Sequence, residues 1–183
     1  MKINIDEITN TRDKYNQLSK IQQANCDYSI SWKQNAAKVL YTKDKEEFYS
    51  AVWWIGVTGN VSRTVPNTQF ETFAKFMFDN RDKISSGELK ITDIELQIDK
   101  KPISWISKIC HIMNPHKYPL IYDENIRSAL GIKDAIQFVE TTEDFRNKIT
   151  HKKIDDIYKM DSIIWASQTR SEWNDEVKLK QQQ

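Results

Sequence analysis

Residues 102–131 constrain the fold most strongly, because two helical patterns flank a short proline-bounded link in this stretch. The first helix is indicated by apolar residues that recur every three or four positions, as on the buried face of a helix. These residues are Ile103, Ile106, Ile109, Cys110 and Met113. Asn114-Pro115 ends the pattern, because a residue before proline is driven out of the helical region. We therefore expect a buried helix that stops there.

The link after this helix leads to an aspartate. Tyr118-Pro119 favours an extended backbone, and the apolar run from Leu120 to Tyr122 is suited to burial. Asp123 then occupies the position of a helix N-cap, and Gly131 is a suitable C-cap for the short helix between them. The pattern predicts a carboxylate that is fixed at the start of a helix, on a link with little freedom.

Helical periodicity also marks most of the remaining chain. Only four Gly and four Pro occur among the 183 residues, which disfavours a many-stranded sandwich or barrel. Capping-box patterns at Asp44–Glu47 and Thr68–Glu71 mark two helix starts. The periodic segments are 6–23, 32–40, 48–55, 70–77, 91–98, 135–139, 141–149 and 154–165, with breaks at 25–31 and 79–87.

The expected fold is therefore all-α, a single compact domain over residues 1–183 with about seven to nine short helices. Residues 91–98 fit a helix or a strand, and we favour the helix. Residues 48–55 are apolar nearly all round, as in a central buried helix. The polar tail 178–183 is expected to fray.

Composition restricts the class of protein further. Hydrophobic residues make up 39% of the chain, enough for a core, but no apolar run reaches transmembrane length. The first residues include acids and lack the apolar segment of a signal peptide. Cys26 and Cys110 are few and far apart, as expected of free thiols in a reducing compartment. We therefore expect a soluble cytoplasmic protein with no membrane partner.

Residues 102–131 resemble the core of the helix-hairpin-helix DNA glycosylases of the endonuclease III type. That family has a hairpin of pattern Leu-Pro-Gly-Val-Gly, a helix, an extended link, and an Asp that opens the next helix. Here residues 101–108 stand in the position of the hairpin and helix start, and Tyr122-Asp123-Glu124-Asn125-Ile126-Arg127 in that of the Asp motif. Residues 48–63 are similar to the family's early buried helix and polar turn. By this resemblance Asp123 matches the catalytic aspartate.

The sequence departs from the family pattern in three ways. The hairpin glycines, which let backbone N–H groups approach a DNA phosphate, are replaced by Ile103, Ser104 and Trp105. Lys108 lies in the right helix for the lysine that lyase-type members use, but about one turn nearer the Asp. The four-cysteine iron–sulfur cluster of some members is impossible with only two Cys. The resemblance therefore implies a monofunctional enzyme with no iron–sulfur cluster or other cofactor.

The function implied by the resemblance is hydrolysis of the N-glycosidic bond of a damaged or modified base, flipped out of DNA, with Asp123 as catalyst. DNA is the expected partner. The expected DNA-binding residues are Asn60, Arg63, Lys101, Ser104, Trp105, Ser107, Lys108, Asn125 and Arg127.

Each of these roles has a structural alternative. Asp123 is equally explained as a plain helix cap. The loop from Thr58 to Asn67 either contacts DNA or only connects two helices, and Trp105 either stacks on a base or belongs to the core. The net charge of +1 and the missing hairpin glycines favour an alternative, a catalytically inactive glycosylase-fold protein that binds DNA or protein. A third possibility is a helical interaction protein unrelated to glycosylases.

The sequence gives no reason to expect a metal site. Cys110 and His111 are adjacent on a predicted helix, so their side chains point about 100° apart and do not converge. His116 lies nearby, but no fourth ligand completes the set that a closed zinc site needs. We expect a buried thiol and ordinary histidines here, and core positions for Trp53, Trp54 and Trp165.

Overall fold

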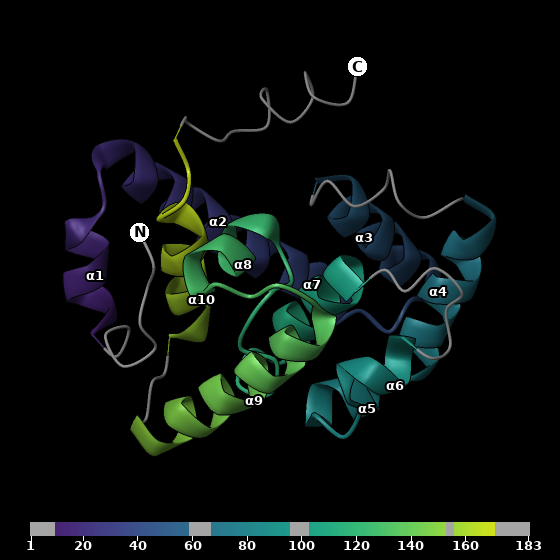
Figure 1. Cartoon of the computed structure of the whole chain (residues 1–183). Coiled ribbons are helices and arrows are strands. Elements are labelled where there is room, and N and C mark those ends of the chain that lie inside the picture. Colours follow the sequence, from purple (N-terminus) through teal and green to yellow (C-terminus); the bar gives the residue numbers. More distant parts are fainter. Residues whose placement is uncertain (1–9, 59–66, 96–102, 153–155, 171–183) are drawn as a thin grey trace.

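The computed structural model describes residues 10–58, 67–95, 103–152 and 156–170, which contain ten α-helices and no strand (Figure 1). The all-α fold expected from the sequence is confirmed. The helices are α1 (Thr11–Gln17), α2 (Lys20–Leu40), α3 (Lys45–Thr58), α4 (Asn67–Asp79), α5 (Arg81–Ser86), α6 (Ile91–Glu95), α7 (Ile103–Met113), α8 (Glu124–Leu130), α9 (Ala135–Lys152) and α10 (Ile157–Ala166).

The helix α7 lies in the middle of the fold (Figure 1). Every residue from Trp105 to Met113 is buried, and α7 packs against α2, α3, α5 and α6. On one side of it α10 packs against both α2 and α8, and on the other α4 packs against α3 and α5. The link that leads to Asp123 therefore leaves from a buried helix with neighbours around it.

A glycine allows α3 and α7 to approach closely. A Cβ atom on Gly56 would lie 2.5 Å from the Trp105 ring, a distance that atoms do not tolerate. The Trp105 indole donates a hydrogen bond to the Val52 carbonyl, 3.0 Å away, and its ring stacks on Phe70 and packs against Phe73. Trp105 is thus a core residue, and it joins α3, α4 and α7.

The link between α7 and α8 is tied down along its length. The Asn114 amide donates to the Ser85 carbonyl at 2.6 Å, and the Tyr118 hydroxyl donates to the Leu89 carbonyl at 2.5 Å. Leu120 is fully buried. Gly131 ends α8 at φ 74°, in the left-handed region that glycine tolerates. The predicted end of one helix at residue 114 and the predicted C-cap of the next are confirmed.

The predicted break at 25–31 is wrong, because α2 continues through it. Asn25 and Cys26 in this stretch are fully buried, and α2 packs along α10. The actual interruption is at Ser19, which forms a capping box with Gln22 and so starts α2 there. Packing against a distant helix therefore outweighs the weak local helix signal of residues 25–31.

Other boundaries also differ from those expected. Residues 135–139 and 141–149 belong to one continuous helix, α9, and the predicted break at 79–87 contains the short helix α5. Trp53 and Trp54 are 41% and 40% exposed, so their expected core positions are wrong. Both still contact other rings, Trp53 against Phe70 and Trp54 stacked on Trp32. Within the described residues, no helix combines the length and the hydropathy that crossing a membrane requires.

Candidate active site

A pocket of about 270 Å³ opens where α2, α7, α8 and α10 meet, next to the end of α3. Its wall combines aromatic rings, aliphatic side chains and charged groups. The residues that line it are Tyr28, Ser29, Trp32, Lys33, Thr58, Lys108, Ile121, Asp123, Glu124, Asn125, Ile126, Asp161 and Trp165. A mostly apolar cleft with a few convergent polar groups is the usual form of a small-molecule site.

Asp123 caps α8 and also faces the pocket. Its Oδ1 accepts a hydrogen bond from the Asn125 backbone N–H at 2.9 Å, as an N-cap does. Its Oδ2 lies 4.0 Å from the Lys108 Nζ, and the side chain remains 28% exposed. The carboxylate is therefore fixed at one oxygen and accessible from the pocket, so its roles as cap and as pocket residue are compatible.

The backbone before Asp123 is held by two buried side chains from different helices. Ser107 Oγ on α7 accepts from the Tyr122 N–H at 2.9 Å, and Asp161 Oδ1 on α10 accepts from the Ile121 N–H at 3.1 Å. Because both acceptors are buried, these bonds are shielded from competing water. The position of the Asp123 carboxylate is thus set from three sides: by its own cap, by α7 and by α10.

Lys108 brings a buried amine to the same pocket. Its side chain is 7% exposed, and Nζ donates to the Ser104 hydroxyl at 2.8 Å while lying 4.0 Å from Asp123. Burial lowers the pKa of Lys108, and the nearby Asp123 and Asp161 carboxylates offset this only in part. An amine of lowered pKa has a larger neutral fraction at neutral pH, as required of a nucleophile or a base.

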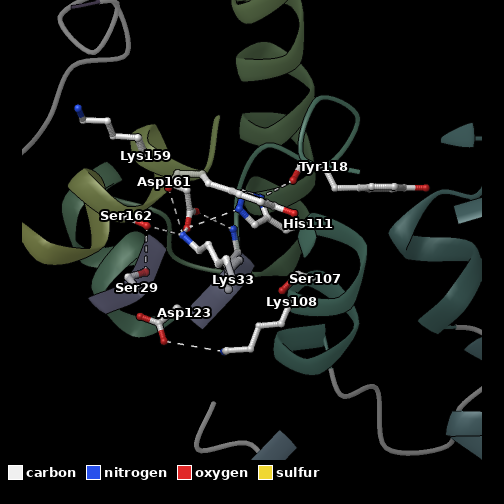
Figure 2. Close-up of polar contacts among 12 residues, drawn as sticks. Ser29, Lys33, Ser107, Lys108, His111, Tyr118, Asp123, Lys159, Asp161 and Ser162 are labelled. Carbon is white, nitrogen blue, oxygen red and sulfur yellow. Dashed lines mark hydrogen bonds and ion pairs between the residues drawn. The ribbon is translucent and has the colours of Figure 1, made fainter. Parts of the chain in front are cut away.

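A second charged pair lies deeper in the same pocket (Figure 2). Lys33 on α2 and Asp161 on α10 form an ion pair at 2.5 Å, with both side chains only 2% exposed. Lys33 Nζ also donates to Ser162 Oγ at 2.8 Å. A buried ion pair is retained only where further hydrogen bonds satisfy both partners, and that condition is met here.

His111 completes this buried network. Its Nδ1 lies 2.8 Å from the Tyr118 carbonyl, and burial lowers the pKa of His111 to about 4, so the ring is neutral at pH 7. A carbonyl can only accept, so Nδ1 carries the proton and Nε2 is left as an acceptor. Among the described residues, Nε2 has no hydrogen-bond partner, and it stands 3.9 Å from the Asp161 carboxylate, which cannot donate to it. The imidazole is fixed in one tautomer beside the ion pair.

The aromatic part of the wall comes from α2 and α10. Trp32 stacks on Trp54 with ring centroids 5.7 Å apart, and its indole donates to the Thr58 hydroxyl at 2.9 Å. Trp165, which was expected in the core, is only partly buried and lines the pocket. The rings of Trp32 and Trp165 provide flat apolar surface suited to a planar ligand.

Eight of the ten predicted site residues separate into three groups. Asp123, Lys108 and Asn125 line the pocket. Ser104 does not line it but accepts a hydrogen bond from Lys108. Asn60, Arg63 and Lys101 lie outside the described residues. Arg127 is directed elsewhere, because its guanidinium lies over the Tyr122 ring and donates to the Lys133 carbonyl.

Trp105 and Ser107 require a correction. The sequence suggested that they face DNA, but they are 1% and 0% exposed. Trp105 fills the space beside Gly56, and Ser107 holds the backbone of Tyr122. Both side chains are too buried for the direct contact with DNA that was predicted, and the amine of the buried Lys108 faces the pocket interior.

Three buried residues near Asp123 were not predicted from the sequence to belong to the site: Lys33, His111 and Asp161. A signal was present for Asp161, which lies four residues after Ile157 and three before Ile164, on the apolar face of the predicted helix. A carboxylate on the buried face of a helix needs a buried partner. The partner, Lys33, is far away in the sequence, and nothing local in the sequence connects the two.

No protein family, curated protein or solved structure that was compared with this chain matches it significantly. Over the residues that the structure describes, no group of three or more His, Cys, Asp or Glu side chains is arranged to hold a metal ion. The site is thus characterised by its own geometry: an accessible carboxylate and a buried amine at a pocket with aromatic walls.

Proposed function

We propose that this chain cleaves the N-glycosidic bond of a nucleotide whose base enters the pocket between α2 and α8. The observation that carries the proposal is the pair formed by Asp123 and Lys108, with oxygen and nitrogen 4.0 Å apart at one pocket wall. The pocket volume of about 270 Å³ is large enough to admit one base. The resemblance of residues 102–131 to helix-hairpin-helix glycosylases supports the same reaction.

Asp123 is the residue proposed to act on the sugar. Departure of the base breaks the bond between C1′ and nitrogen, the base keeps the electron pair, and positive charge develops on the sugar. A carboxylate beside C1′ stabilises that charge and then accepts a proton from the water that attacks C1′. Asp123 meets the requirement because one oxygen is held by the Asn125 N–H and the other faces the pocket.

In the same reaction Lys108 either attacks the sugar itself or forms no bond with the sugar while water attacks. The sequence suggested a monofunctional enzyme, because Lys108 lies about one turn nearer the aspartate than in lyase-type members. Its lowered pKa and its distance to Asp123 nevertheless favour an amine that attacks C1′ and forms an imine with the opened sugar. Reduction with borohydride distinguishes the two roles, since only the imine yields a covalent complex of protein and DNA.

The decisive experiment compares Asp123→Asn with Asp156→Asn. Both residues are N-caps that accept a backbone N–H, but only Asp123 lines the pocket. Asparagine caps a helix as well as aspartate does, so both variants should fold. The substrates are duplexes that contain single uracil, hypoxanthine, 8-oxoguanine or alkylated bases, and base release is measured after strand cleavage in alkali. We expect Asp123→Asn to lose about 10²–10⁴-fold in rate, and Asp156→Asn to retain it.

The alternative of an inactive binding module predicts a different outcome. In that case the wild-type chain releases none of these bases but still binds the duplexes at low salt. Unchanged base release by Asp123→Asn would refute the assigned role of this residue. Absence of both base release and binding at low salt would exclude both functions that involve DNA.

A further inference from the structure

The polar network below the pocket ends in a hydroxyl group that is free to act as a donor. Lys33 has three N–H protons, and three acceptors surround them: Asp161 Oδ2 at 2.5 Å, Ser162 Oγ at 2.8 Å and the Tyr158 carbonyl at 3.5 Å. An ammonium group has no further donor to offer. Although Lys33 lines the pocket, its protons are already engaged by the protein.

The direction of the remaining bonds follows from this arrangement. Ser162 Oγ accepts from Lys33, so its own proton is available, and Ser162 donates to the Ser29 hydroxyl at 3.0 Å (Figure 2). Ser29 therefore accepts at its oxygen, and its proton makes no further hydrogen bond within the described part of the chain. A cation at the start of such a series polarises each hydroxyl in turn and strengthens the last donor.

Ser29 is the member of the series that a ligand can reach. Ser162 is fully buried, whereas Ser29 is only partly buried and lines the pocket beside Trp32. A ligand stacked on the Trp32 ring therefore meets a hydroxyl donor at the α2 side of the pocket. Asp123 and Lys108 lie at the α7–α8 side.

We propose that Ser29 is a specificity-determining residue, and that it selects bases whose edge carries a carbonyl oxygen. Uracil, hypoxanthine and 8-oxoguanine belong to this class. The inference rests on the proposed function in one respect, since it takes the ligand of this pocket to be a nucleobase. Binding of the base and cleavage of the glycosidic bond are separable, so the two proposals can fail independently.

The experiment uses free bases in matched pairs that differ by one carbonyl group. Hypoxanthine is compared with unsubstituted purine, and 2-pyrimidinone with unsubstituted pyrimidine. Dissociation constants are measured by ligand-observed NMR titration for the full chain and for the variants Ser29→Ala, Ser29→Thr and Ser162→Ala. None of these residues takes part in the proposed bond cleavage.

The wild-type chain should bind each carbonyl-bearing base about 2- to 10-fold more tightly than its partner, as one net hydrogen bond provides. Ser29→Ala should remove this preference and Ser29→Thr should keep it, because threonine retains the hydroxyl. Ser162→Ala should reduce the preference, since the Ser29 proton is then no longer directed toward the pocket. In every variant the affinity for the carbonyl-free bases, purine and pyrimidine, should stay at the wild-type value.

A preference that persists in Ser29→Ala, or that is unaffected in Ser162→Ala, would overturn the inference. So would the absence of any binding of the carbonyl-bearing bases. A Ser29-dependent preference in a chain that releases no base from DNA would uphold the inference and reject the proposed reaction. The opposite result is also possible: base release is lost in Asp123→Asn, but the wild-type chain binds both members of each pair equally well. That result would uphold the proposed reaction and reject the inference.

Discussion

Lys108 and His111 lie one turn apart on α7, and burial lowers the pKa of both side chains. The two side chains have different surroundings and are therefore suited to different roles. Lys108 reaches a pocket that contains a partly exposed carboxylate, so its neutral form can meet a ligand. His111 is fully enclosed, donates to a backbone carbonyl and has no exposed atom. Lys108 is therefore suited to react with a ligand, and His111 to hold the link between α7 and α8 in place.

Replacement of Lys108 should show that the buried amine lowers stability. In the folded chain its pKa is below the ordinary value of 10.5, so the unfolded chain binds the proton more strongly. At neutral pH this difference disfavours folding, and it is relieved as the pH rises from the lowered pKa toward 10.5. We expect Lys108→Met to stabilise the protein at pH 7 by about 1–2 kcal/mol, and to abolish any borohydride-trapped complex.

Thermal unfolding followed by circular dichroism measures this gain. The control is Lys75→Met, because Lys75 is exposed and its pairing with Asp79 is a surface contact. That variant should keep the wild-type melting temperature. A Lys108→Met protein that melts below the wild type would contradict the prediction.

His111 should contribute a loss of stability in mild acid. Its pKa falls from 6.5 to about 4 on folding, mainly because of burial. Between these values the unfolded chain binds more protons than the folded chain, so stability is lost as the pH falls from 6.5 toward 4. The shift corresponds to a loss on the order of 3 kcal/mol. In His111→Asn, whose amide can still donate to the Tyr118 carbonyl, this part of the pH dependence should disappear.

Urea unfolding between pH 4 and pH 7.5 measures the difference between wild type and variant. The comparison removes the contribution of the carboxylates that both chains share. The absolute stability of His111→Asn should be lower at pH 7, because the smaller side chain leaves a cavity. Parallel pH profiles for the two proteins would show that His111 is not the titrating group.

At the scale of single elements, several features that are decided locally were predicted from the sequence. The end of α7 at Asn114, the Asp123 cap and the Gly131 C-cap each depend on a few neighbouring residues, and each is observed. The continuity of α2 was missed, because it depends on packing against α10. The Lys33–Asp161 pair was missed for the same reason, since it joins two helices 128 positions apart. Local propensity carries no information about such partners.

The contact between α3 and α7 predicts that alanine at Gly56 has the opposite effect on stability to the one it usually has inside a helix. Glycine to alanine inside a helix normally stabilises by about 1 kcal/mol. At Gly56 the added methyl group would meet the Trp105 ring at 2.5 Å, so either the indole or α3 must shift. We expect Gly56→Ala to destabilise the protein by about 1–3 kcal/mol.

The control is Ser50→Ala, at an exposed position on the same helix. It should leave the free energy of unfolding within about 0.5 kcal/mol of the wild type. Both variants are measured by urea unfolding at pH 7. A Gly56→Ala protein as stable as the wild type would mean that α3 and α7 are not held at this distance.

At the scale of the whole molecule, one hydrophobic cluster includes buried residues from α2 to α10 among the described helices. The pocket lies beside this cluster, and its polar groups come from helices that meet only in the folded chain. Helical periodicity was sufficient to predict the fold class and the helix that carries Lys108. It could not predict which helices pack together, and therefore could not assemble the site.

The same arrangement predicts an uneven distribution of local stability. α7 has nine buried residues and neighbours on several sides, whereas α1 has no buried residue. The contacts of α1 include a hydrogen bond from the Tyr15 hydroxyl to Asp27 and a Lys159 ammonium over the Tyr15 ring. Surface contacts of this kind contribute little, so α1 should open without global unfolding.

Amide hydrogen exchange at pH 7 tests this prediction helix by helix. The amides of Ile106 to Ile112 on α7 should exchange only through global unfolding, and their protection should fall in step with the free energy of unfolding as urea is added. The amides of Tyr15 to Gln17 on α1 should exchange far faster, with little dependence on urea, because their opening exposes little surface. Tyr15→Ala should speed exchange in α1 and leave α7 unchanged. Equal protection in α1 and α7 would mean that α1 belongs to the same cooperative unit as the core.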